Sequence, residues 1–114
     1  MVTAEYRPDR GDVVWLNFHP QAGHEQAGRR PALVLSPTNY NIRTRLALVC
    51  PITSRVKGYP FEVPLPSGLA VSGVVLADHL KSVDWSARKA ELVCKVSTSV
   101  LGEVGAKLRP LLGL

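Results

Sequence analysis

Residues 12–36, DVVWLNFHPQAGHEQAGRRPALVLS, contain two short apolar runs separated by a polar, glycine-punctuated stretch. The first run, 12–18, is bounded by Gly11 on one side and by a His-Pro pair on the other. The second run, 31–36, opens at Pro31, whose missing N–H is tolerated at the start of a strand. Its nearly continuous hydrophobicity predicts a strand that is buried on both faces. The strongest local pattern is therefore β structure.

The same pattern continues along the chain. Further strand-like runs occupy residues 46–54, 61–66, 71–77, 80–85 and 89–96. Proline within a run favours a bulge or a sheet edge, which we expect at Pro51 and in the run 61–66. Clusters of Gly, Pro, Asn and Ser separate the runs at short intervals, as is typical of a compact antiparallel barrel or sandwich.

The C-terminal segment, residues 97–114, has a different periodicity. Its apolar residues recur at helical spacing: Val100, Leu101, Val104, Leu108, Leu111 and Leu112. Ser97 or Thr98 is suited to cap the start of this helix, and Pro110 is expected to kink or end it. We find no repeat, linker or low-complexity segment, so the sequence predicts one domain over residues 1–114.

The overall charge indicates the kind of partner. The 114-residue chain has a formal charge of +5 and a pI near 9.6, which favours a polyanionic or acidic partner. No run approaches the roughly 18 apolar residues of a membrane span, and the N-terminus lacks the apolar region of a signal peptide. We therefore expect a cytoplasmic protein, with Cys50 and Cys94 as free thiols.

Several chemistries lack their sequence signatures. There is no GxGxxG or Walker pattern and no nucleophile elbow. His19, His24 and His79 are too far apart in the sequence, and lack suitable companions, to form a recognisable zinc motif. We therefore expect no metal and no organic cofactor.

Three polar clusters lie at the ends of predicted strands. They comprise His24, Glu25, Gln26, Arg29 and Arg30, then Thr53, Ser54, Arg55 and Lys57, and finally Asp78 and His79. In a small barrel, neighbouring strand ends can bring such loops together. A guanidinium donates two parallel hydrogen bonds to phosphate, and a hydroxyl adds another donor. Taken together, the clusters indicate a phosphate-binding surface.

Each of these residues also has an ordinary structural interpretation. Adjacent Arg29 and Arg30 suit a solvated surface, and Thr53 suits a strand. Asp78 suits a turn or a helix cap, and His79 suits a histidine with satisfied hydrogen bonds. Individually these signals favour the ordinary interpretation, and their common position after strands, in a basic chain, adds modest weight to the functional one.

Four stretches together resemble the MazF/PemK family of toxin endoribonucleases from bacterial toxin–antitoxin modules. They are GDVVWLNFHP, EQAGRRPALVLSP, PITSRVKGYPFEVPL and GVVLADHLKSVDW. They occur in the order seen in the family, from about residue 6 to residue 90, and so cover most of the chain.

The resemblance implies a mainly β fold, an SH3-like antiparallel barrel of the plasmid-maintenance-toxin type with a C-terminal α-helix. It implies a homodimer that cleaves single-stranded RNA, often messenger RNA, at short specific sequences without a metal. The products would carry a 2′,3′-cyclic phosphate and a 5′-hydroxyl. The implied partner is a cognate MazE-like antitoxin, whose acidic disordered tail would compete with RNA for one basic surface.

The resemblance also assigns roles to residues. The arginine before proline in the family's EQxGxRP pattern falls on Arg30, the threonine of its P-x-T segment on Thr53, and the loop carboxylate on Glu25. These three are the predicted catalytic residues. The predicted RNA-binding residues are His24, Gln26, Arg29, Asn41, Ser54, Lys57, Asp78 and His79. Asn41 belongs to a segment, 39–45, that we expect to be a loop contacting unstacked bases.

Two alternatives share the expected fold. One is a barrel that binds RNA or protein without cutting, and the other is a gyrase-poisoning toxin of the CcdB type. The presence of Glu25, Arg30 and Thr53 together favours catalysis, and the stretches EQAGRRP and KGYPFEV match the ribonuclease branch better. Incubation with a long single-stranded RNA in EDTA separates the three possibilities.

Overall fold

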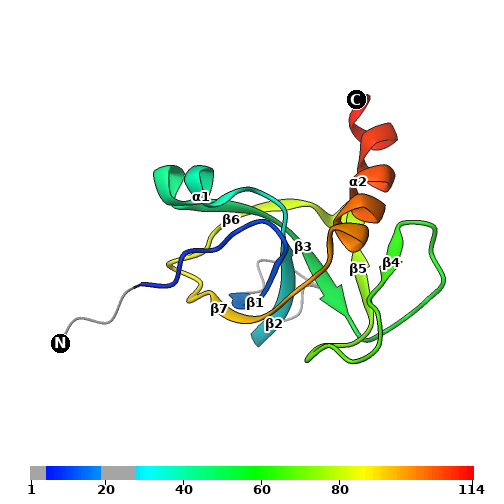
Figure 1. The fold of residues 1–114 in the computed structure, drawn as a ribbon, viewed down its shortest axis with the longest axis horizontal. Coiled ribbons are helices and arrows are strands. Elements are labelled where there is room, and N and C mark those ends of the chain that lie inside the picture. The colour runs from blue at the N-terminus through cyan, green and yellow to red at the C-terminus, as the bar shows by residue number, and fades with distance from the viewer. Residues whose placement is uncertain (1–4, 19–27) are drawn as a thin grey trace.

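The computed structural model describes residues 5–18 and 28–114 (Figure 1). In chain order the elements are β1 (Asp12–Phe18), β2 (Gly28–Val34), α1 (Thr38–Thr44), β3 (Leu46–Thr53), β4 (Glu62–Pro64), β5 (Val74–Leu76), the short 3₁₀ helix η1 (Ala77–His79), β6 (Lys81–Asp84), β7 (Glu91–Lys95) and α2 (Thr98–Leu112). The described part of the chain is thus mainly β with a C-terminal helix, as the sequence predicts.

Every strand pairs with its neighbours in antiparallel fashion. The order is β4-β5-β3-β2-β1-β7, and β6 pairs with β3 beside this path. The strand β4, which contains Pro64, lies at one edge, as predicted for the proline-rich run. Pro51 lies instead in the interior strand β3, where the partner changes from β6, which pairs up to Val49, to β5, which pairs from Ile52. The predicted bulge or edge at Pro51 is thereby replaced by a change of partner.

The start of β2 differs from the prediction. The strand begins at Gly28 rather than at Pro31, because residues 28–30 pair with the end of β1. Pairing with β3 begins only at Ala32, so Pro31 lies where β1 is the only strand that pairs with β2. Arg29 and Arg30 therefore lie on a strand and not in a loop.

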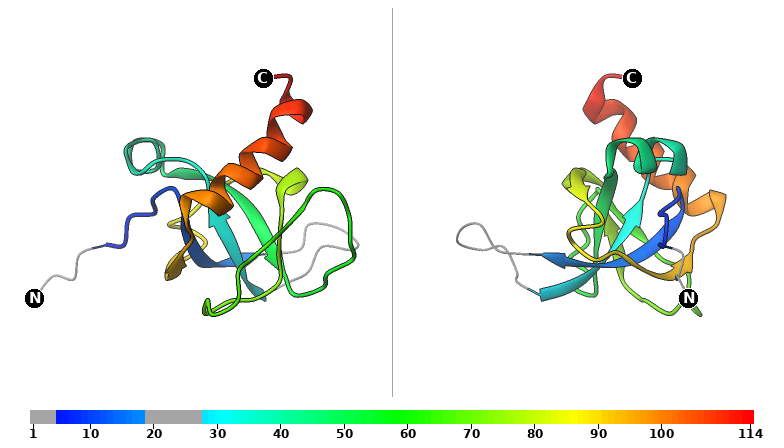
Figure 2. Two further views of the ribbon diagram at one scale, coloured as in Figure 1. Left: turned by 45° about the vertical axis from the view of Figure 1, so that its right-hand side comes forward. Right: turned by 90° about the vertical axis from the view of Figure 1, so that its left-hand side faces the viewer.

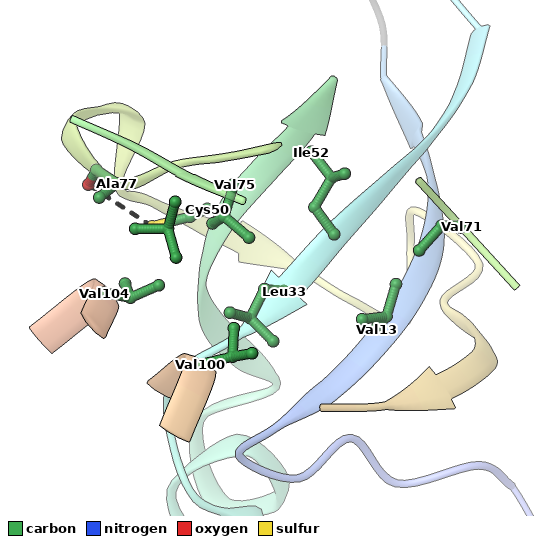
Figure 3. Close-up of a cluster of buried hydrophobic side chains, with 10 residues drawn as sticks. Val13, Leu33, Cys50, Ile52, Val71, Val75, Ala77, Val100 and Val104 are labelled. Carbon is green, nitrogen blue, oxygen red and sulfur yellow. Dashed lines mark hydrogen bonds between the residues drawn. The ribbon is translucent and has the colours of Figure 1, made fainter. Parts of the chain in front are cut away.

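Apolar side chains fill both faces of the central strands, as predicted from their continuous hydrophobicity. One cluster contains Val13 and Leu33 and is covered by Val100 and Val104 of α2, which point toward it in Figure 3. A second cluster holds the alternate residues of the same strands: Val14, Leu16, Ala32, Val34, Ala47 and Val49, together with Val83 and Trp85. The two clusters make the central strands a rigid support for residues at their ends.

The helix α2 begins where the sequence predicts and continues further than predicted. The Ser97 hydroxyl accepts a hydrogen bond from the Val100 N–H and caps the start. Pro110 does not end the helix, which continues to Leu112. Because Pro110 lies in the last turn, it removes only one helical hydrogen bond, and the chain leaves the helix at Gly113, in a left-handed conformation with φ of 72°.

Candidate active site

A pocket of about 280 Å³ opens where β2 begins and β3 ends, near the segment that leads into β5. Ten residues line it: Trp15, Arg29, Arg30, Pro31, Ile52, Thr53, Ser54, Ala70, Val71 and Ser72. The lining therefore combines apolar side chains with guanidinium and hydroxyl groups. This combination suits a ligand that has both an apolar face and an anionic group.

Arg30 and Thr53 both line this pocket. Each lies two residues beyond Ala32 and Pro51, the last pair of the β2–β3 ladder. Both residues are half-buried. Within residues 5–18 and 28–114, the Arg30 guanidinium makes no hydrogen bond and no ion pair. It therefore keeps its donors for a ligand.

The Thr53 hydroxyl is oriented by its own loop and remains able to donate. Its oxygen accepts a hydrogen bond of 3.1 Å from the Arg55 N–H. Such a bond uses a lone pair and leaves the hydroxyl hydrogen for another acceptor. Thr53 and Arg30 together thus offer two kinds of donor to a phosphate oxygen.

Gly73 supports the backbone of Thr53 from the neighbouring segment. Its φ is +115°, and a Cβ atom there would lie 2.0 Å from the Thr53 carbonyl oxygen. Only glycine permits this approach. The sequence analysis missed Gly73, although a glycine inside the run 71–77 is a recognised signal of close backbone contact.

The neighbouring arginine has different surroundings. Arg29 donates to Asn17 Oδ1 at 2.8 Å and to the Lys89 carbonyl oxygen at 2.7 Å, and its Nη2 lies 3.2 Å from Glu91 Oε1. Its guanidinium therefore interacts with β1 and with the start of β7. Arg29 also lines the pocket, so its predicted contact with RNA stays a prediction.

Two predicted residues lie in or near the loop that follows β3. Ser54 lines the pocket. Lys57 does not line it; its N–H and that of Gly58 donate to the Glu62 carboxylate at 3.1 and 2.9 Å. The ammonium of Lys57 lies 5.7 Å from the centre of the exposed Tyr59 ring. The loop is therefore held in place while its cationic side chain stays at the surface.

Asp78 and His79 form η1, which packs against α2 and β3. Their side chains are exposed, with 3.8 Å between Asp78 Oδ1 and His79 Nε2. Neither residue lines the pocket.

The prediction that Asn41 contacts RNA is wrong. The segment 39–45, expected to be a loop, forms most of α1, and the Asn41 side chain is fully buried. Its amide donates to the Pro8 and Ser36 carbonyl oxygens, both at 2.9 Å, and its oxygen accepts from the Ser36 hydroxyl at 2.5 Å. Asn41 therefore holds α1 against the N-terminal segment.

His24, Glu25 and Gln26 lie outside the described residues, so their predicted roles stay predictions.

Both cysteines are free, as predicted. Burial, with a smaller contribution from Asp78, raises the pKa of Cys50 to about 12. Among residues 5–18 and 28–114, no three His, Cys, Asp or Glu side chains gather as metal ligands. In the same residues, no helix has the length and apolar character needed to cross a membrane.

The fold and pocket define a small basic β protein with a pocket lined by guanidinium and hydroxyl groups at two strand ends. Comparison with known proteins makes this class specific: the chain belongs to the PemK-like, MazF-like toxins of type II toxin–antitoxin systems, a family that matches residues 9–112. The implied SH3-like barrel type is thereby confirmed, because the fold matches MazF from Deinococcus radiodurans with a TM-score of 0.90. That match has 63% identity and covers 96% of this chain and 100% of the other.

Two further relatives support the assignment. The endoribonuclease toxin MazF of Escherichia coli K12 is 47% identical over 112 residues, covering 98% of this chain and all of the relative. The endoribonuclease PemK of Escherichia coli is 36% identical over 110 residues, covering 91% of this chain and 81% of the relative. A structure of the MazE–MazF complex from Deinococcus radiodurans also matches, with a TM-score of 0.90, 63% identity, and coverage of 96% and 99%.

Proposed function

We propose that this protein is an endoribonuclease toxin that cleaves single-stranded RNA, including messenger RNA, at short specific sequences. The single observation that supports the reaction site is the presence of Arg30 and Thr53 in the lining of one pocket, where no described residue uses the donors of either side chain. Cleavage of messenger RNA inhibits translation and growth, and it takes place in the cytoplasm.

The proposed reaction needs no metal. The ribose 2′-oxygen attacks the adjacent phosphorus in line, so that the O2′–P bond forms as the P–O5′ bond breaks. The 2′-hydroxyl gives its proton to a base, and the leaving 5′-oxygen receives a proton from an acid. The products are a 2′,3′-cyclic phosphate and a 5′-hydroxyl.

Arg30 stabilises the negative charge that grows on the non-bridging phosphate oxygens. Arginine stays protonated near neutral pH, so this role suits it better than proton abstraction. The Thr53 hydroxyl donates to one phosphate oxygen. Glu25 takes part in proton transfer, with His24 and His79 as the other candidates.

The remaining predicted residues bind the RNA strand around the cleaved bond. Ser54 lines the pocket. Lys57 follows three residues later in the chain and contributes a cationic side chain. We assign Gln26, Asp78 and His79 to substrate positioning in the assembled toxin.

The protein acts within a toxin–antitoxin pair and as a dimer. An antitoxin with an acidic disordered tail fits a chain of net charge +5, and covering the basic surface would exclude RNA. A second copy of the chain fits the apolar end of α2, where Leu111, Leu112 and Leu114 are 51%, 54% and 86% exposed. We treat residues 1–114 as one toxin domain.

The test uses the purified full chain and a long single-stranded RNA in EDTA. We expect discrete cleavage and fragments whose 5′ ends accept phosphate from a polynucleotide kinase without prior dephosphorylation. RNA that stays intact while the protein binds it would identify a binding module. Intact RNA together with stalled gyrase would identify a gyrase poison, and cleavage that occurs with added Mg²⁺ but not in EDTA would overturn the metal-free mechanism.

A further inference from the structure

The ends of β1 and β2 extend beyond the rest of the sheet. Residues Gly28, Arg29 and Arg30 pair only with Phe18, Asn17 and Leu16, because the β2–β3 ladder begins at Ala32. In the right-hand view of Figure 2, the blue and cyan ends of these strands lie side by side and extend away from the other strands. A two-stranded ribbon is only marginally stable by itself. Arg30 is therefore attached to a part of the sheet that needs further support.

The hydrogen bonds of Arg29 provide that support. They join β2 to the Asn17 side chain on β1, to the Lys89 carbonyl oxygen and to the Glu91 carboxylate at the start of β7. The turn before β7 is itself fixed, since the Ala90 N–H donates to the Trp85 carbonyl oxygen. We call Arg29, Asn17, Glu91 and the Lys89 carbonyl group the arginine clamp.

The same turn also holds the backbone of Asn17. The Asn17 N–H donates to the Arg88 carbonyl oxygen at 2.9 Å, and Arg88 Nη1 donates to the Asn17 carbonyl oxygen at 3.0 Å. The end of β1 is thus fixed to the turn by its main chain, and the end of β2 is fixed to both by Arg29. The clamp completes a three-element support at the end of the ribbon.

Charge and geometry separate the roles of the two arginines. The Glu91 carboxylate balances the charge of Arg29, and two of its guanidinium nitrogens already donate to protein groups. Side chains alternate along a strand, so Arg29 and Arg30 leave β2 in opposite directions. Both contribute to the pocket lining, and the hydrogen bonds of Arg29 hold its guanidinium against β1 and the start of β7. A free Arg29 would instead compete with Arg30 for the same phosphate.

We propose that Arg29 is a positioning residue for RNA cleavage: the arginine clamp fixes the end of β2 and so aligns Arg30 with the reacting phosphate. The proposal rests on the proposed function. It differs from the sequence-based expectation that Arg29 contacts phosphate directly. Misplacement of a catalytic group by about 1 Å costs up to about a hundredfold in rate, so the clamp should affect turnover and not RNA affinity.

The test compares Arg29→Ala with Arg43→Ala, which removes the same charge from an exposed position on α1. We expect Arg29→Ala to lower kcat about ten- to a hundredfold, with KM unchanged. We also measure binding to an RNA with a 2′-deoxy residue at the cleavage position. The Arg29→Ala variant should bind this RNA with the same affinity, and the same salt dependence of affinity, as Arg43→Ala. A weaker affinity, with the salt slope reduced by about 0.7 and kcat preserved, would identify a phosphate contact and overturn the proposal.

Asn17→Ala provides a second, milder variant that leaves both arginines in place. We expect it to lower kcat in the same direction, and the Arg29→Ala/Asn17→Ala double variant to lose less than the product of the two single losses, because the residues form one unit. Parental kcat in both single variants would overturn the clamp while leaving the proposed function intact. Absence of cleavage by the parental protein would overturn both.

Discussion

The polar side chains near the two ends of β1 differ in whether other groups of the protein use their hydrogen-bonding capacity. At its start, Asp12 is 2% exposed and accepts hydrogen bonds from the Tyr6 hydroxyl, from the Asp9 N–H at 3.0 Å and from Lys95 Nζ at 2.6 Å. At its far end, the pocket holds Arg30 and Thr53 with donors that no described side chain uses. We call these two regions the Asp12 network and the pocket.

The difference separates stability from function. No buried side-chain nitrogen or oxygen in the described part of the chain lacks a hydrogen-bond partner. The unused donors of the pocket are therefore accessible ones, which cost little in the free protein and become valuable when a phosphate arrives. Substitutions in the Asp12 network should change the free energy of unfolding, whereas substitutions in the pocket should change the rate of cleavage.

Loss of the Asp12 carboxylate should have the largest effect. Asp12→Ala removes the acceptor of the Tyr6 hydroxyl, the Asp9 N–H and the Lys95 ammonium, and we expect the free energy of unfolding to fall by about 3 kcal/mol. Urea denaturation measures this change. Glu103→Ala, on the exposed face of α2, is the control and should stay within about 0.5 kcal/mol of the parental protein. Equal midpoints for the two variants would contradict the role of the network.

Gly73→Ala links the two regions, since it should affect both stability and rate. The new Cβ would collide with the Thr53 carbonyl oxygen, and the positive φ adds backbone strain. We expect a loss of about 1–3 kcal/mol in the free energy of unfolding and slower RNA cleavage, because Thr53 must move. Gly102→Ala is the control: open space surrounds it in α2, and it should stabilise the protein by up to about 1 kcal/mol. A Gly73→Ala variant with parental stability and rate would refute the close contact.

Thr53→Val should change the rate with little effect on stability. The substitution keeps the shape of the side chain and removes the hydroxyl, which we expect to cost about tenfold in kcat, as for a hydrogen bond to a charged group. Thr53→Ser restores the donor and should recover most of the activity. Single-turnover cleavage measures both variants, and equal rates for the two would show that the hydroxyl has no part in the reaction.

The smallest expected effect is on the pH dependence of the free energy of unfolding, and it involves Asp9 beside the Asp12 network. Hydrogen bonds from Thr38 hold the pKa of Asp9 below its ordinary value of 3.8. This contribution is fully present above that value and is lost as the pH falls through the lowered pKa of the folded protein. The stability difference between the parental protein and Asp9→Asn should therefore be constant near neutral pH and shrink below about pH 4. A difference that does not change across this range would contradict the assignment.

Most of the strands could be predicted from the sequence because hydrophobic periodicity is a local property. The run 12–18 matches β1 residue for residue, and the helix cap at Ser97 follows from local chemistry. The start of β2 was missed because pairing with β1, and not the apolar run itself, determines where it begins. Asn41 was misplaced because its burial depends on Pro8, which lies 33 residues away in the sequence.

The candidate site likewise has features that the sequence could predict and features that depend on the fold. Arg30 and Thr53 came from motif resemblance, and the fold brings both into the lining of one pocket. The partners of Arg29 lie on β1 and β7, so no local pattern revealed the arginine clamp. Gly73 carried a local signal, but its contact with Thr53 needed the fold.

The proposed mechanism depends most on the positive charge that Arg30 contributes to the pocket. The most direct test is single-turnover cleavage of one RNA by Arg30→Ala and by Arg43→Ala, with urea midpoints measured for both. We expect Arg30→Ala to be slower by about 10²- to 10³-fold with a parental midpoint, and Arg43→Ala to cleave at the parental rate. Cleavage by Arg30→Ala at the parental rate would contradict the account.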